Sequence, residues 1–295
     1  MSCSLDRGSI ALLRAISRGG WAVPADLARL ACVSSEEIDA RLQALRHSGV
    51  IGPFRAAPFL PAMHGGLWAR YVVRLYKLDL KLEERLVGNL SGLEESLHNV
   101  CFFTKRFPRT SFFCFSQTAE ELKLILREAG VEEEPLEVLS YNFPFSVVLS
   151  DEERLLLRTV NSTGEVIPSL LARQLEREPS WVQAKLRRLI LHSDNPQGVA
   201  ILKATIHWYR IDNFIHAHVL IPIEAKERLS EFCKGLDWDE LSWPGESSQT
   251  IAVEVDFNGW GHFAEWKSYL ELAGFPPQGF ALFAEERIHA KGFEF

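Results

Sequence analysis

The first fifty residues carry apolar side chains at the spacing of short amphipathic helices. Leu12 and Leu13 fall within a helix expected over 6–18, which Gly19-Gly20 ends. Pro24 fits the first turn of a second helix, where a proline is tolerated. After a turn at 32–35, a third helix is expected with a buried stripe of Ile38, Leu42 and Leu45. This order predicts a helix-turn-helix.

The same pattern returns 144 residues further along the chain without a gap. The aligned pairs include Leu12 with Leu156, Leu13 with Leu157, Arg14 with Arg158, Pro24 with Pro168, Leu27 with Leu171 and Leu45 with Leu189. Most of these residues are apolar and stand at helical spacing, which chance composition does not arrange so regularly. A repeat of this kind predicts a duplicated structural unit.

After each third helix along the chain, the pattern changes to strands that alternate with helices. In the first copy, 49–56 is expected to form the wing of the helix-turn-helix. Strands are expected at 67–78, 99–104, 111–116 and 135–141, with helices at 80–89 and 118–129. The second copy has strand material at 205–223, 240–243, 250–257 and 280–288, with helices at 224–234 and 262–272. The order β-α-β-β-α-β is that of a ferredoxin-like domain.

The predicted fold class is therefore α+β, in two tandem copies of a winged helix-turn-helix followed by a ferredoxin-like domain. The expected domains are a first helix-turn-helix at 1–60, a first ferredoxin-like domain at 61–145, a second helix-turn-helix at 146–200 and a second ferredoxin-like domain at 201–295. Residues 143–148 are expected to link the halves.

Composition indicates a globular protein of the cytoplasm. The apolar share of 47% and the charged share of 24% are ordinary for such a protein. No window approaches about 18 uncharged apolar residues, so no transmembrane helix and no membrane partner are expected. The start of the chain lacks the pattern of a secretory signal. The five cysteines are scattered without a CxxC pair, so neither a metal site nor a disulfide framework is expected.

The segment from Val33 to Ile51 resembles the helix-turn-helix of Lrp/AsnC regulators. The matching residues are Val33-Ser34-Ser35, Ile38, Arg41-Leu42, Leu45 and Gly49-Val50-Ile51. The second copy departs from the motif, with Asn195–Val199 in place of the Gly-Val-Ile run. The resemblance implies a transcriptional regulator that binds double-stranded DNA, responds to a small effector and pairs or self-associates through its sheets. A fused duplicate would supply both protomers of such a pair in one chain.

Sirohaem decarboxylases share this plan and are the second resemblance. The run 99–107 stands where that family places a basic hairpin, although 111–115 reads Ser-Phe-Phe-Cys-Phe instead of the family's Tyr-Asn-x-Trp-Phe type segment. The resemblance implies a tetrapyrrole ligand, whereas the regulator requires no cofactor. A third alternative is a protein-interaction scaffold with vestigial helix-turn-helix modules. No nucleophile–base pair or phosphate loop stands out, so no catalytic residue is predicted.

The third helix of the second copy is the favoured DNA-reading element. Its expected outward residues are Ser180, Gln183, Lys185, Arg187 and Arg188, whose types suit base edges or phosphates. In the first copy, Arg41 and Arg46 could contact the DNA backbone, but acidic residues at 36, 37 and 39 would repel phosphates. A solvated helix face is the alternative for both. The net charge of −7 also weighs against DNA binding.

Two groups of residues are candidates for binding an effector. Lys105, Arg106 and Arg109 lie on the expected hairpin and could bind carboxylates. His216 and His218 alternate on a strand and therefore share a face. Two imidazoles without a carboxylate or thiolate nearby in the sequence are a weak metal signal. A charged hairpin tip and a satisfied histidine pair are the alternatives.

Overall fold

The computed structural model describes residues 4–75, 97–103, 110–128, 130, 137–192, 194–241, 250–277 and 279–287. The predicted helix at 80–89 and the residues Lys105, Arg106 and Arg109 lie outside these ranges. Among the described residues, none of the helices has the length and apolar character needed to cross a membrane.

Three short helices open the chain: α1 (Arg7–Arg18), α2 (Pro24–Leu30) and α3 (Ile38–His47). Asp6 caps α1, because its Oδ1 accepts the backbone N–H of Ser9 at 2.7 Å. Gly19 ends α1 with a φ of 75°, a conformation that suits glycine. The apolar stripes of the three helices meet in one buried core, as their spacing predicted.

The second half repeats this order with α7 (Asp151–Thr163), α8 (Pro168–Leu175) and α9 (Pro179–Leu189). Ser150 and Glu153 form a reciprocal cap at the start of α7, with Glu153 Oε2 accepting the N–H of Ser150 at 3.0 Å. Gly164 ends α7 in the left-handed conformation. Helix α8 begins at Pro168, where the aligned proline predicted the first turn of a second helix.

The strands that follow the two helical units pair with each other. Strand β1 (Ile51–Pro58) runs antiparallel to β6 (Ala200–Ile206), with Ala56 opposite Leu202. The prediction that 49–56 forms a wing is wrong, because within the described residues β1 pairs with β6 and not with a neighbouring hairpin strand. Many of its side chains are buried, which a solvent-exposed wing would not allow.

A short helix, α4 (Leu60–His64), leads into the first group of strands. These strands are β2 (Gly66–Leu75), β3 (Leu97–Phe103), β4 (Thr110–Ser116) and β5 (Glu137–Phe143), with α6 (Ala119–Glu128) before β5. Their order across the sheet is β5-β2-β4-β3.

The second group has the corresponding order β10-β7-β9-β8. Its elements are η1 (Trp208–Arg210), β7 (Ile215–Pro222), η2 (Ile223–Arg228), α10 (Leu229–Phe232), β8 (Asp237–Leu241), β9 (Thr250–Phe257), α11 (Gly259–Leu272) and β10 (Gly279–Arg287). The run 205–223, predicted to hold strand material, contains β7 but is interrupted at η1 because Trp208 turns into the core of the helical units. The helix predicted at 224–234 is a 3-10 helix followed by one α-helical turn.

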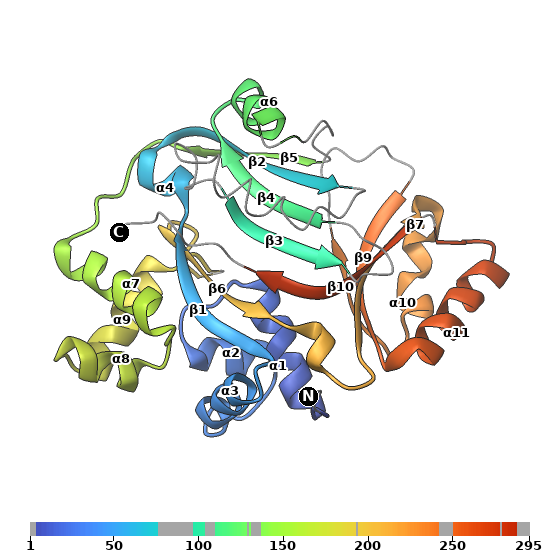
Figure 1. The fold of residues 1–295 in the computed structure, drawn as a ribbon, viewed down its shortest axis with the longest axis horizontal. Helices are drawn as coiled ribbons and strands as arrows, with labels where there is room; N and C mark the ends of the chain where they lie inside the picture. Colours follow the sequence, from blue (N-terminus) through green and yellow to red (C-terminus); the bar gives the residue numbers. More distant parts are fainter. Residues whose placement is uncertain are drawn as a thin grey trace.

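The two groups join edge to edge through β3 and β10, with Glu286 opposite Cys101. Within the described ranges the strands form one ten-stranded sheet. Figure 1 shows α1–α3 below this sheet, α7–α9 at the left and α10 with α11 at the right. One core lies among the helical units and the paired strands β1 and β6. A second core lies between strands β7 and β9 and the helices α10 and α11.

Candidate functional site

Strands β7 and β9 present polar side chains on one face and apolar ones on the other. His216 lies opposite Asp256 and His218 lies opposite Glu254 in the antiparallel register. The intervening Ala217 and Val255 belong to the second core, beneath α10 and α11. Alternation along the strands therefore gathers two imidazoles and two carboxylates on the face turned away from that core.

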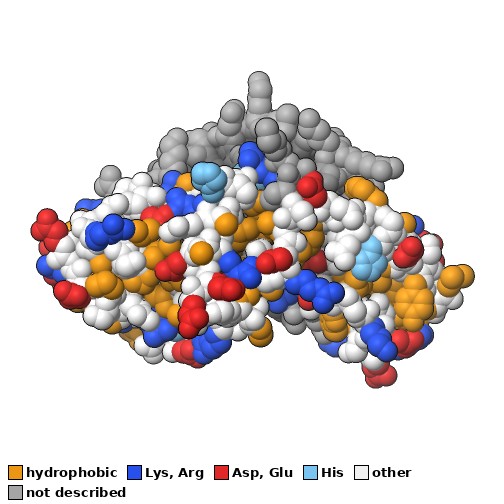
Figure 2. Space-filling view, turned by 90° about the horizontal axis from the view of Figure 1, so that it is seen from below, with side chains coloured by type: hydrophobic (Ala, Val, Ile, Leu, Met, Phe, Trp, Pro, Cys, Tyr) orange, Lys and Arg blue, Asp and Glu red, His pale blue; other side chains and the backbone are white. Residues whose placement is uncertain are grey.

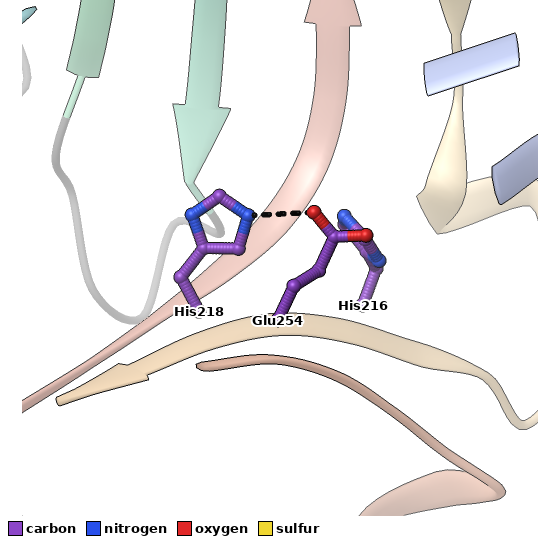
Figure 3. Close-up of side chains that lie close together, drawn as sticks. All are labelled: His216, His218 and Glu254. Atoms are coloured by element: carbon purple, nitrogen blue, oxygen red, sulfur yellow. Dashed lines mark hydrogen bonds and ion pairs between the residues drawn. The ribbon is translucent and has the colours of Figure 1, made fainter. Parts of the chain in front are cut away.

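The four side chains interact in cross-strand pairs. Nδ1 of His216 lies 2.7 Å from Oδ1 of Asp256, and Nε2 of His218 lies 3.3 Å from Oε2 of Glu254 (Figure 3). The His216 side chain is completely buried and stacks on Trp208, with ring centroids 4.3 Å apart. The position of the His216 ring is therefore fixed both by packing and by a carboxylate.

Helix α1 covers this face with two arginines. Nε of Arg14 lies 2.9 Å from Oδ2 of Asp256, and Nε of Arg18 lies 3.6 Å from Oε1 of Glu254. Arg14 also reaches the exposed Asp237 at 3.2 Å. The residues Arg14, Arg18, His216, His218, Glu254 and Asp256, here called the polar cluster, thus lie where the first helical unit meets the second group of strands.

The polar cluster holds Glu254 in its charged form. Burial alone would raise the pKa of Glu254, but the hydrogen bond from His218 and the positive charges of His216, His218 and Arg18 outweigh burial and hold that pKa well below its usual range. Burial lowers the pKa of Arg18 from its ordinary value.

Two carboxylate oxygens of the cluster retain hydrogen-bonding capacity. Among the described residues, Oε1 of Glu254 and Oδ2 of Asp256 accept no hydrogen bond, and their arginine contacts have ion-pair distances only. Oxygens with spare acceptor capacity beside two imidazoles make the cluster a candidate binding site.

Because the folded-state pKa of Glu254 is depressed, its contribution to stability is present above the ordinary value of 4.5 and is lost as the pH falls below it. We therefore expect the wild-type free energy of unfolding to drop more on acidification through this range than that of Glu254→Gln. Urea unfolding at neutral and acidic pH measures the difference. Glu271→Gln, at an exposed position, is the control and should follow the wild type; equal pH dependence of all three proteins would contradict the assignment.

The residues predicted to read DNA in the second copy all come from α9, but their exposure differs. Ser180 is exposed at the first turn of the helix and Gln183 is half-buried. Nζ of Lys185 lies 3.1 Å from Oε1 of Glu153, and Arg188 pairs with the same carboxylate. Since Glu153 is only 2% exposed, these two cations hold α9 against the start of α7.

Arg187 pairs across the two halves. Its Nη2 lies 3.1 Å from Oδ1 of Asp26 at the start of α2. A hollow of about 650 Å³ opens beside this contact, between α2 and the end of α9. Its lining includes Arg29, Arg188 and His192 together with acidic residues, and Arg29 lies 3.3 Å from Asp194. Sequence reasoning missed Arg29, because only the packing of α2 against α9 gives it these neighbours.

The two arginines predicted in the first copy are paired as well. Nη1 of Arg41 lies 2.8 Å from Asp6, and its Nη2 lies 3.2 Å from Glu37. Hydrogen bonds from Arg41 lower the pKa of Asp6 to about 2. Arg46 forms an ion pair with Glu165 of the other half. Figure 2 views the molecule from below and shows acidic and basic side chains interspersed on its lower face.

Comparison with known proteins gives weak likenesses of fold. No protein-family model and no curated protein matches the chain. A solved structure of the sirohaem decarboxylase NirDL is 15% identical, with 98% of this chain and 96% of that chain covered and a TM-score of 0.42. An AsnC family transcriptional regulator from Agrobacterium tumefaciens is 16% identical over 50% of this chain and 95% of its own, with a TM-score of 0.25. AsnC from E. coli is 15% identical over 50% of this chain and 97% of its own, with a TM-score of 0.23.

Likenesses this weak assign neither a family nor an activity to the chain. The structure itself defines an α+β protein whose two groups of strands and two helical units pack together.

Proposed function

We propose that the chain is a DNA-binding regulator of Lrp/AsnC type, built from two tandem copies of a helix-turn-helix and a ferredoxin-like domain. The repeat of 144 residues and the equal strand orders, β5-β2-β4-β3 and β10-β7-β9-β8, support the duplication. The pairing of β1 with β6 supports an arrangement in which the two copies form an intramolecular pseudo-dimer.

The outward face of α9 is the observation that carries the proposal. Ser180 and Gln183 stand near its amino-terminal end, where a recognition helix meets base edges. The side chains of Arg187 and Arg188 are 46% and 59% exposed. The carboxylates stay bonded when these arginines turn to DNA phosphates, because Lys185 remains with Glu153 and the backbone N–H groups of Ala22 and Val23 donate to Asp26.

The contacts divide the predicted DNA-binding residues into two roles. Lys185 is only 27% exposed and stays with buried Glu153, so it positions α9. Arg188 can then leave Glu153 for a phosphate without stranding that carboxylate. Arg41 and Arg46 serve the packing of the first helical unit, because carboxylates from Asp6, Glu37 and Glu165 already hold them. The second copy is therefore the DNA-reading one.

We expect wild-type protein to bind duplex DNA at low salt, and the double change Arg187→Ala with Arg188→Ala to weaken binding at least tenfold. Each phosphate or base interaction that the double change removes is worth about 1 kcal/mol or more. Fluorescence anisotropy with labelled duplexes selected from a random pool measures the affinities. Arg228→Ala is the matched control, because Arg228 forms an exposed ion pair with Glu231, outside the helical units. Absence of binding by the wild type at low salt would contradict the proposal.

A tetrapyrrole decarboxylase is the second candidate, and the polar cluster favours it. Decarboxylation releases carbon dioxide and places a proton on the carbon that lost it, so a reaction of this class needs a proton donor. His218, which is 21% exposed, could supply that proton, while Arg18 could bind a substrate carboxylate. Titration with an iron uroporphyrin, followed by absorption, tests this function. An absorption spectrum that the protein leaves unchanged would contradict the decarboxylase function.

A further inference from the structure

We propose that His216, His218 and Glu254 bind one divalent transition-metal ion. One ligand atom from each residue lies within 4.8 Å of the other two. Figure 3 shows the carboxylate of Glu254 between the two imidazoles, all three rising from neighbouring strands. Two imidazoles and one carboxylate are a ligand set that zinc and cobalt accept. This inference is independent of DNA binding.

The strand register builds the site. His216 and His218 are two residues apart on β7, and Glu254 faces His218 from β9. Nitrogen and oxygen ligands about 2.0–2.2 Å from a tetrahedral ion stand about 3.3–3.6 Å apart. The distance from His218 Nε2 to Glu254 Oε2 is already 3.3 Å, and the proton that this nitrogen shares with the carboxylate moves to Nδ1 or leaves to solvent when a metal binds. Because packing fixes the His216 ring, Glu254 and His218 are the side chains that rotate to complete the site, from separations within 4.8 Å.

A second layer of contacts orients His216. Its Nδ1 donates to Oδ1 of Asp256 at 2.7 Å, and this bond leaves Nε2 as the ring nitrogen with a lone pair to offer a metal. Arg14 holds the other oxygen of Asp256 at 2.9 Å. The sequence Arg14–Asp256–His216 is the kind of carboxylate–histidine support that fixes a metal ligand's tautomer and ring orientation.

Charge at the site is compatible with a cation. The carboxylate of Glu254 already has a cationic partner, because Nε of Arg18 lies 3.6 Å from its Oε1. Its present partner Arg18 is 40% exposed and lies at the long distance of 3.6 Å, so Arg18 can turn to solvent when a metal takes its place. Three protein ligands leave a fourth position for water or a small ligand. The site thus has the composition of an open metal centre.

The test is titration of the full chain, freed of metal by a chelator and dialysis, with Co²⁺ and with Zn²⁺. We expect one ion per chain, a visible absorption band with Co²⁺ that Zn²⁺ abolishes, and a higher Tm with Zn²⁺. His218→Ala and Glu254→Gln should each weaken binding at least tenfold and remove the band. His47→Ala, at an exposed histidine, should leave both unchanged.

His216→Ala is avoided because His216 is fully buried, whereas His218 is partly exposed and Glu254→Gln preserves shape. Circular dichroism and the Tm without metal establish that each variant folds. If one variant fails to fold, the other decides. Absence of binding by the wild type, or equal affinity in the wild type and the folded variants, would overturn the proposal.

Discussion

Arg14→Ala should lower the free energy of unfolding by about 3–5 kcal/mol. Removing one partner of a buried ion pair leaves the other charge without compensation, and losses of this size follow. Arg14 and Asp256 are each only 6% exposed, so the carboxylate of Asp256 cannot be solvated by water once Arg14 is removed. The change also removes a contact between α1 and the second group of strands. Urea unfolding followed by circular dichroism measures the loss.

The repeat supplies a matched control for this prediction. Arg158 aligns with Arg14 at the offset of 144 residues, but its side chain is exposed on α7. Arg158→Ala should therefore cost less than about 0.5 kcal/mol. Equal losses for the two changes would show that the polar cluster contributes nothing particular to stability.

Trp208→Ala should lower the free energy of unfolding by about 3–5 kcal/mol, the usual range for emptying a buried aromatic site. Trp208 is 1% exposed, packs in the core of the helical units and stacks on His216 of β7. It therefore joins the core of the helical units to the second group of strands. We also expect this variant to separate the unfolding of those parts, which thermal unfolding followed by tryptophan fluorescence and circular dichroism would reveal.

The adjacent Tyr209 gives the control, because its side chain is 56% exposed. Tyr209→Ala should cost well under about 1 kcal/mol and leave the transition unchanged. A Trp208→Ala protein as stable as Tyr209→Ala would contradict the role assigned to this contact.

Local patterns predicted most of the elements. The strand expected at 250–257 is β9 with the same bounds, because alternating apolar residues bury one face against α11. The helices α7 and α11 were also expected close to their observed bounds, since capping residues and apolar spacing are local signals. The interruption at Trp208 was not predicted, because its cause is burial in a core formed by distant residues.

Long-range pairing could not be predicted in the same way. Ile51–Pro58 has the composition of a wing strand, and only the presence of β6 makes it a partner in a two-stranded ladder. The joining of β3 to β10 likewise depends on two sheet edges meeting. The residues of a strand predict which of its faces is buried, but they do not predict which strand pairs with it.

The candidate sites show the same limit. The alternation of His216 and His218 was visible in the sequence, but Glu254 is 36 residues beyond His218 and enters through register. The cationic residues of α9 were identified from the sequence, but the carboxylates that pair with them were not. Glu153 and Asp26 come from α7 and from the start of α2, so their pairing with Lys185 and Arg187 required the packed helices.

The central claim is that α9 binds DNA through Arg187 and Arg188, and its most direct test is the dependence of affinity on salt. Each arginine that no longer neutralises a phosphate should reduce the slope of log affinity against log salt by about 1. We predict a measurable negative slope for the wild type and a shallower slope for the double alanine variant, by about 1–2. The same slope in both proteins, or no binding by the wild type, would contradict the claim.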